Sequence, residues 1–256
     1  MLKIGRVLSC VGLAFAVAVS GTAARAEALQ VSAAASLTDG FQEIGGVYSK
    51  QHPGDRVEFS FAGSQAIRMQ IEQGAPVDVF ASADLVQMQP LVNARLVDTA
   101  HIFTHNRLVV IASRKSGKVR SLPDLARPGI SVVVGGPTVP VGRYTSEVLT
   151  KLGQRYGKDF KSQVMANVVS DEVSVRSVLT KVVFGEADAG FVYTTDAAGS
   201  GSEVLLIDIP ARFNITAAYP IAVVSRTSNR RGAEAFMSLV LGRMGQDILA
   251  KHGFQK

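Results

Sequence analysis

Cysteine is almost absent from this sequence, since Cys10 is the only one in 256 residues. A framework of disulfide bonds is therefore excluded, and the fold must depend on a hydrophobic core, which a chain of this length can form. Tryptophan is absent too, whereas Val and Ala are plentiful and 47% of the residues are hydrophobic. This composition indicates a packed globular protein and argues against a disordered one.

Long hydrophobic runs are also missing, except for one at the N-terminus. Lys3 and Arg6 precede the apolar run "VLSCVGLAFAVAVSG", and "ARA" follows it with small residues before Glu27. This order predicts a cleaved secretory signal peptide over residues 1–26. No later segment approaches the roughly 20 apolar residues that a membrane-spanning helix needs.

An excess of charge of one sign is lacking in the mature chain. Three of the 27 Lys and Arg residues lie within residues 1–26, so 24 basic residues face 21 acidic ones and leave a net charge of +3. There is no dense basic stripe with interleaved aromatic residues. The sequence therefore argues against nucleic acid as a partner.

Motifs of the common hydrolases and metal enzymes are missing as well. His101 and His105 have the spacing of two metal ligands on a helix, but the Glu of a zinc protease is absent, and solvated loop histidines explain them better. No G-x-S-x-G elbow occurs, and "VGGPTVPVG" lacks the Lys-Ser/Thr of a phosphate-binding loop. Asp78 and Asp84 flank "VFASA", where a strand-end residue and a helix N-cap are simpler interpretations than an acid pair. We therefore expect no enzyme, no cofactor and no direct cation ligand.

Strand and helix patterns alternate along the mature chain. Strands are predicted at "ALQVSAAAS", "DRVEFSFA", "VDVFASA", "RLVVIAS", "ISVVVGG", "DAGFVY" and "YPIAVV", with helical patterns between most of them. This alternation predicts an α/β fold with mixed, mostly parallel sheets. The pattern restarts after "RLVVIAS", which indicates lobe 1 from residues 27–108 and 220–256, and lobe 2 from residues 109–219. We expect two crossing strands to join the lobes and a ligand to bind in the cleft between them.

Four junctions between a strand and a helix are candidate anion sites. Helices are predicted to begin at Ser36, at Ser64, within residues 139–142 and within residues 173–176. The first N–H groups of a helix have no intrahelical acceptor and carry the positive end of the helix dipole. Several such helix ends aimed at one point can bind an anion without Lys or Arg.

Taken singly, these residues have simpler interpretations. Ser36 has Asp39 three residues later, as in a capping box, and serine is common at the N-cap of a helix. Tyr193 in "GFVYTTDA" fits a buried tyrosine that bonds to a nearby carbonyl. We expect Ser36 to cap its helix in the empty protein. When an anion is bound, we expect Ser36 and the helix end to contact the anion instead.

Six stretches taken together resemble a known family: "VSAAASLTDGFQEI", "FSFAGSQAIRMQIEQGAPVDVFASAD", "RLVVIAS", "GGPTVPVGRYTSEVL", "GEADAGFVYTTDA" and "YPIAVV". In this order they resemble the periplasmic molybdate-binding proteins of bacterial ABC transporters, over nearly all of the mature chain. The resemblance implies a two-lobe periplasmic-binding-protein fold of type II with the ligand cleft between the lobes. It also implies a periplasmic monomer that delivers molybdate or tungstate to a membrane permease.

The resemblance further implies five residues that hold the oxyanion through neutral donors. The hydroxyl donors are those of Ser36, Ser64 and Tyr193, and the two serines also offer their backbone N–H groups. The remaining donors are the backbone N–H groups of Val141 and Val175. Molybdenum would then be bound only as molybdate, by these same residues.

Departures from the family pattern keep other ligands open. Val141 stands where the family usually has Ala, and its extra methyl groups are expected to crowd the cavity. Gly63 stands where another small residue is often found, which is expected to loosen the following turn. Asp171 and Glu172 lie close to the helix end at Val175. The alternative is a receptor for another tetrahedral oxyanion, such as sulfate, thiosulfate or phosphate.

Two functions of other classes are also open. An enzyme with an anionic substrate needs a base near the cleft, and the sequence places neither a histidine nor a carboxylate of raised pKa there. The effector domain of a regulator shares the two-lobe fold. The predicted signal peptide and the absence of an N-terminal DNA-binding helix pair argue against it.

Overall fold

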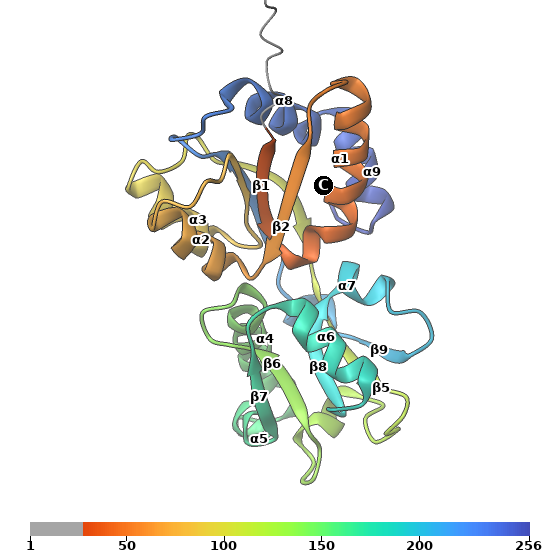
Figure 1. The fold of residues 1–256 in the computed structure, drawn as a ribbon. Coiled ribbons are helices and arrows are strands. Elements are labelled where there is room, and N and C mark those ends of the chain that lie inside the picture. Colours follow the sequence, from red (N-terminus) through yellow and green to blue (C-terminus); the bar gives the residue numbers. More distant parts are fainter. Residues whose placement is uncertain (1–27) are drawn as a thin grey trace, which may run out of the picture.

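The computed structural model describes residues 28–256, which form two lobes with one five-stranded sheet in each (Figure 1). The predicted signal peptide, residues 1–26, lies outside the described residues. No helix in the described part of the chain is long and apolar enough to cross a membrane. The predicted α/β fold with mixed sheets is confirmed.

The sheet of lobe 1 has the strand order β2-β1-β3-β10-β4. Its strands are β1 (Leu29–Ala34), β2 (Val57–Ala62), β3 (Val79–Ala81), β4 (His101–Asn106) and β10 (Ala217–Val223). β1 is parallel to β2 and β3, whereas β10 is antiparallel to both β3 and β4. Four strands therefore share one direction, and β10 runs against them.

The sheet of lobe 2 repeats this layout with the order β7-β6-β8-β5-β9. Its strands are β5 (Leu108–Ser113), β6 (Val132–Gly135), β7 (Val168–Glu172), β8 (Ala189–Tyr193) and β9 (Val204–Asp208). β6 is parallel to β7 and β8, and β5 is antiparallel to β8 and β9. Again four strands share one direction. In both lobes, the strand that runs against the others follows a connection between the lobes.

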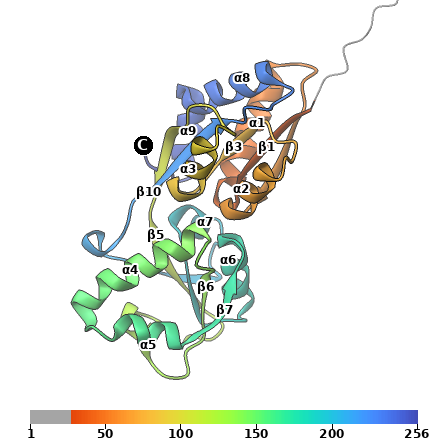
Figure 2. The same cartoon turned by 90° about the vertical axis from the view of Figure 1, so that its left-hand side faces the viewer.

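Helices cover both faces of the first sheet (Figures 1 and 2). One face carries α1 (Thr38–Gln51), α8 (Arg230–Leu241) and α9 (Arg243–Lys251), and the other carries α2 (Ser64–Glu72) and α3 (Leu85–Asn93). Their apolar residues recur at helical spacing and are buried against the sheet, as in the row Phe41, Ile44 and Tyr48 of α1. The short turn η1 (Ala35–Leu37) leads from β1 directly into α1.

Lobe 2 has the same layered arrangement (Figure 2). Its helices are α4 (Pro140–Tyr156), α5 (Phe160–Ala166), α6 (Val175–Phe184) and α7 (Thr194–Ala198), with short turns η2 (Leu122–Ala126) and η3 (Ala211–Phe213). α4 continues past Gly153 to Tyr156, since a single glycine costs a helix only about 1 kcal/mol and the space beside Gly153 is open.

Two connections join the lobes. The first is the single residue Arg107 between β4 and β5, and the second is the segment 209–216 between β9 and β10. The segments "RLVVIAS" and "YPIAVV" fall on β5 and β10, each of which lies within one sheet, so neither strand itself crosses between the lobes. The crossings therefore occur just before these strands, next to the predicted lobe limits.

Candidate functional site

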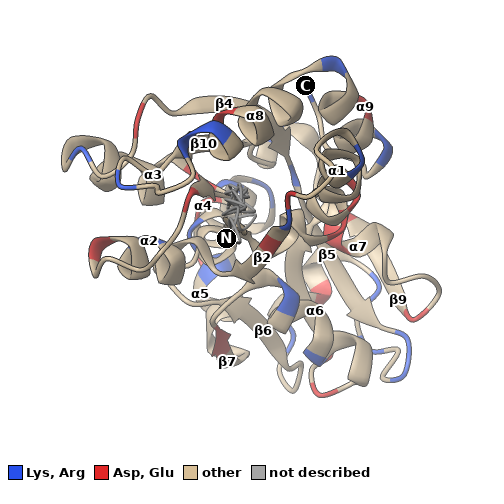
Figure 3. Cartoon of the chain, turned by 45° about the horizontal axis from the view of Figure 1, so that its top comes forward, with Lys and Arg blue, Asp and Glu red and all other residues tan. Residues whose placement is uncertain are grey.

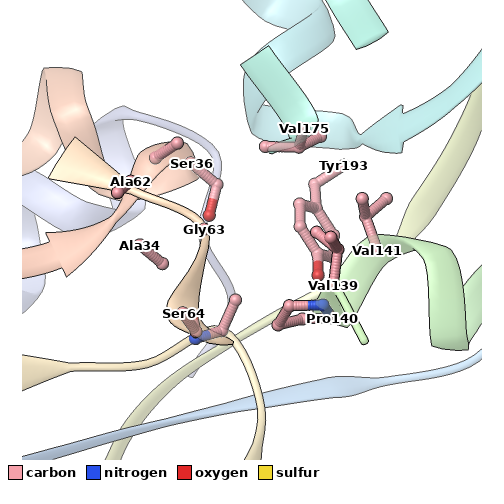
Figure 4. Close-up of a pocket in the computed structure, with 12 residues that line it drawn as sticks. Ala34, Ser36, Ala62, Gly63, Ser64, Val139, Pro140, Val141, Val175 and Tyr193 are labelled. Carbon is pink, nitrogen blue, oxygen red and sulfur yellow. The ribbon is translucent and has the colours of Figure 1, made fainter. Parts of the chain in front are cut away.

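A small cavity lies between the two lobes, and none of the described residues that line it is Lys, Arg, His, Asp or Glu. Its volume of about 10 Å³ is close to the smallest that can hold one water molecule. The structure brings all five predicted residues into its wall (Figure 4). The lining residues are Ala34, Ala35, Ser36, Ala62, Gly63, Ser64, Ala83, Val139, Pro140, Val141, Val175 and Tyr193.

Ser36 lies within the turn η1 and does not cap a helix. Its Oγ is 2.9 Å from the hydroxyl oxygen of Tyr219, and neither η1 nor α1 has a side-chain cap. The predicted capping box with Asp39 is therefore wrong, because the turn begins before Ser36. Asp39 instead contacts Arg176 of lobe 2 at 2.5 Å.

Ser64 is the first residue of α2, and Gly63 occupies the N-cap position. Its Oγ accepts a hydrogen bond from the N–H of Ala83 at 3.0 Å. This contact with the loop after β3 replaces the simple cap that the sequence suggested. The hydroxyl hydrogen of Ser64 stays available for another acceptor.

Three helices direct their N-terminal ends to the cavity. α2 begins at Ser64, α4 begins at Pro140, and α6 begins at Val175. Proline has no N–H, so Val141 supplies the first N–H group of α4. In α6, the N-cap Ser174 accepts from the N–H of Ser177 at 3.3 Å. The N–H group of Val175 has no acceptor within its helix, as is general for the first turn.

Tyr193, the last residue of β8, has an unusual environment. The side chain is 1% exposed, and its hydroxyl has no hydrogen-bond partner among the described residues. The predicted bond from Tyr193 to a nearby carbonyl is therefore wrong. Burial, together with the nearby Tyr219, raises the pKa of Tyr193 well above its usual range, which keeps it a neutral donor. A buried hydroxyl without a partner costs about 1–3 kcal/mol, so an acceptor in the cavity would restore that free energy.

The two departures at Val141 and Gly63 have structural explanations. A Cβ atom at Gly135 would lie 2.6 Å from Cγ1 of Val141, so the missing side chain at Gly135 accommodates a methyl group of Val141. A Cβ atom at Gly63 would lie 2.3 Å from the carbonyl oxygen of Val173 in lobe 2. The backbone of Gly63 is ordinary, with φ −63° and ψ 138°. Gly63 therefore permits close approach of the lobes and does not loosen its turn.

Ion pairs join the lobes around the cavity. Arg143 of α4 contacts Asp84, the N-cap of α3, at 3.2 Å. Arg176 of α6 contacts Asp39 of α1 across the cleft at 2.5 Å and, within lobe 2, Asp196 of α7 at 2.8 Å. Burial raises the pKa of Asp84 and raises that of Asp196 to about 6. Sequence reasoning placed no carboxylate of raised pKa near the cleft, but it identified Asp84 as a helix N-cap, which is confirmed.

Side-chain amides add two further contacts between the lobes. Gln65 Nε2 donates to the carbonyl oxygen of Val173 at 2.9 Å, and Gln87 Nε2 donates to that of Thr138 at 2.9 Å. Together with the ion pairs, they hold the lobes together at the cleft. Along the ribbon, Lys and Arg positions alternate with Asp and Glu positions on both lobes (Figure 3).

The paired histidines form no metal centre. His101 and His105 lie on strand β4, where the sequence suggested a loop. The described residues contain no group of three or more His, Cys, Asp or Glu side chains that could hold a metal ion. The uncharged cavity between the lobes is therefore the strongest candidate site.

Comparisons with known proteins agree with this architecture. The family model of bacterial extracellular solute-binding proteins matches residues 29–255. The chain is 38% identical over 239 residues to the molybdate-binding protein ModA of Mycobacterium tuberculosis H37Rv, covering 93% of this chain and 88% of the relative. It is 33% identical over 253 residues to ModA of Escherichia coli K12, covering 95% of each.

A solved structure supports the same assignment. The periplasmic molybdate-binding protein of Azotobacter vinelandii matches with a TM-score of 0.77 at 26% sequence identity, covering 89% of this chain and 99% of that chain. The two lobes, the cavity between them and these matches lead to one conclusion: the chain belongs to the family of bacterial extracellular solute-binding proteins.

Proposed function

We propose that this protein is the molybdate receptor of an ABC importer and that it also accepts tungstate. The observation that carries the proposal is the buried Tyr193 hydroxyl, which has no hydrogen-bond partner within residues 28–256 and lines an uncharged cavity where three helices begin. The relatives named molybdate-binding proteins support the same ligand. With the predicted signal peptide, the receptor would work in the periplasm as a monomer and deliver the anion to a membrane permease.

Neutral donors would hold the anion. We assign the hydroxyls of Ser36, Ser64 and Tyr193 and the backbone N–H groups of Val141 and Val175 to this role. A hydrogen bond to a charged group contributes roughly 1.5 kcal/mol, so five of them give about 7.5 kcal/mol, close to micromolar affinity. The N–H groups of the two serines would tighten binding, and the cost of ordering the lobes would weaken it.

Selectivity among oxyanions would depend on whether the anion carries a proton and on the size of the anion. Phosphate at neutral pH carries a proton that needs an acceptor, whereas this cavity offers mainly donors. Sulfate has the same charge as molybdate and no proton, so only the dimensions of the cavity, set in part by Val141, can reject it. Molybdate and tungstate are similar in size, and we expect little discrimination between them.

Closure of the lobes would couple binding to transport. Lobe 1 supplies Ser36 and Ser64, and lobe 2 supplies Val141, Val175 and Tyr193. An anion that bonds to both sets favours the closed arrangement, because only there are all the donors engaged. The permease would then recognise the closed form.

A catalytic function has weaker support. Asp84 and Asp196 are carboxylates of raised pKa near the cleft, but each is paired with an arginine. Neither lines the cavity. A general base must reach its substrate, so we propose a binding protein and not an enzyme.

Calorimetric titration of residues 27–256 with molybdate, tungstate, sulfate and phosphate tests the proposal. We expect tight one-to-one binding of the first two and weak or absent binding of the others. Ser36→Ala should weaken molybdate binding, whereas Ser113→Ala should not. Ser113 is the matched control because it is equally buried but lies at the far end of β5. Binding of sulfate alone would contradict the ligand assignment. Absence of binding for all four anions would contradict the assignment of the cavity as an oxyanion site.

A further inference from the structure

Ser36 is part of a buried chain of polar groups that leads away from the cavity. Its Oγ lies 2.9 Å from the hydroxyl oxygen of Tyr219, and either atom could be the donor. Behind Tyr219, the Nδ2 of Asn106 lies 3.5 Å from the same hydroxyl oxygen. Tyr219 and Asn106 are both 0% exposed, so water does not reach them to exchange these partners.

The orientation of the Asn106 amide is determined by its neighbours. Its Oδ1 accepts from the backbone N–H of Arg107 at 2.9 Å and from Thr194 Oγ1 at 2.9 Å. A backbone N–H can only donate, so the oxygen of the amide must face Arg107. The Nδ2 therefore faces Thr195 Oγ1, at 2.9 Å, and the hydroxyl of Tyr219.

This orientation decides the direction of the bond between Tyr219 and Ser36. The distance of 3.5 Å makes the bond from Asn106 weak, but an amide N–H₂ group cannot accept a proton at all. The Tyr219 proton therefore cannot point to Asn106, and Ser36 Oγ is the other acceptor within reach. Burial raises the pKa of Tyr219 well above its usual range, so the proton is retained. With one lone pair occupied by Tyr219, the Ser36 hydroxyl turns its own hydrogen to the cavity.

We propose that Tyr219, oriented by Asn106, is a positioning residue that keeps Ser36 a hydrogen-bond donor and so makes the site select fully deprotonated tetrahedral oxyanions over protonated ones. This inference rests on the proposed function of the cavity and assigns its selectivity to residues outside its wall. Without the Tyr219 hydroxyl, Ser36 would be free to rotate and to accept a proton from hydrogen phosphate. Anions with and without a proton would then be distinguished less well.

The test compares Tyr219→Phe with Tyr48→Phe in the full mature chain. Tyr48 is the matched control, because it is a buried tyrosine of lobe 1 whose hydroxyl makes only long contacts, of 3.5 Å, with Asp55 and Gly232. Molybdate affinity is measured by calorimetry, and phosphate affinity by competition with molybdate. Tyr219→Phe should weaken molybdate binding about tenfold and reduce the preference for molybdate over phosphate by a similar factor. Tyr48→Phe should change neither.

A double-mutant cycle shows whether Tyr219 acts through Ser36. In a Ser36→Ala background, Tyr219→Phe should change the ratio of the two affinities no further. An unchanged ratio in the single variant, or an undiminished effect in the Ser36→Ala background, would overturn the inference. If Tyr219→Phe does not fold, Asn106→Ala takes its place, with the same expected loss of preference and the same contrary outcome. Failure of the wild-type protein to bind any of the anions would refute the proposed function itself, which separates the two failures.

Discussion

The two walls of the cavity differ in how their hydroxyl groups are held. In lobe 1, Ser36 pairs with Tyr219, and Ser64 accepts from the N–H of Ala83, so both hydroxyls are oriented without a ligand. In lobe 2, the hydroxyl of Tyr193 is buried with no partner among the described residues. One wall is therefore pre-organised, and the other contains a polar group that an anion would satisfy. The loss of a hydroxyl should therefore destabilise the empty protein in lobe 1, but leave its stability unchanged or raise it in lobe 2.

Ser64→Ala is expected to have the largest effect on binding, and it should also lower stability. The change removes one of the proposed donors to the anion and leaves the buried N–H of Ala83 without its acceptor. We expect molybdate affinity to fall more than tenfold and the free energy of unfolding of the empty protein to fall by about 1–2 kcal/mol. Calorimetry and urea denaturation measure the two quantities. Unchanged stability would show that the wall of lobe 1 is not pre-organised in this way.

Tyr193→Phe should separate binding from stability. The change removes one donor, so affinity should fall about tenfold, but it also removes a hydroxyl that is unsatisfied in the empty protein. The free energy of unfolding without ligand should therefore stay the same or rise by up to about 1 kcal/mol. The same two measurements apply. A clear loss of stability would mean that Tyr193 has a partner in the empty protein, and the contrast between the lobes would disappear.

Gly63→Ala tests the contact between the walls and leaves every proposed donor in place. The new Cβ would lie 2.3 Å from the carbonyl oxygen of Val173, a backbone atom, so the two walls must move apart there. We expect a several-fold loss of molybdate affinity and an increased radius of gyration of the complex in solution scattering. Gly46→Ala is the control, since a Cβ there meets nothing within 4 Å. Equal affinities of both variants would show that this approach of the lobes is not needed for binding.

Asp196 in lobe 2 should make the stability of the protein depend on pH. Burial raises its pKa to about 6, above the usual value of an unfolded aspartate near 3.9, so the folded state retains the proton longer. Its contribution to stability is therefore favourable at low pH and is lost as pH rises from about 4 to about 6. The free energy of unfolding of Asp196→Asn, relative to that of the wild type, should therefore rise between pH 4 and pH 7, by up to about 3 kcal/mol. Urea denaturation at both pH values measures this, and a difference independent of pH would contradict the assignment.

Sequence patterns predicted the elements that bury a clear apolar face. β1, β3, β5, β6 and β8 are buried along their length, and their apolar runs are plain in the sequence. The elements that were missed include β4, β7 and β9 at sheet edges and the short helices α5 and α7. Edge strands have one face and one edge exposed, so polar residues such as those of "VVSDE" obscure their pattern.

The wall of the cavity was predictable only in part. The helix ends were visible as strand-to-helix junctions, and the resemblance to molybdate-binding proteins selected the five residues among them. The partners of the serines were not visible, because Tyr219 lies 183 residues from Ser36 and Ala83 lies 19 residues from Ser64. Local sequence therefore favoured helix capping, whereas packing of distant strands decided the actual hydrogen bonds. The only sign of the role of Tyr219 in the sequence was its position at the start of the predicted buried strand "YPIAVV".

The position of the bound metal atom tests the account most directly. Crystals of the mature chain grown with molybdate should show one strong anomalous peak at the molybdenum absorption edge, in the cavity between the lobes. We expect the oxygen atoms around it to lie about 2.7–3.1 Å from the hydroxyls of Ser36, Ser64 and Tyr193 and from the N–H groups of Val141 and Val175. A peak outside this cavity, or one held by Lys, Arg or His side chains, would contradict the proposal of a neutral site divided between two lobes.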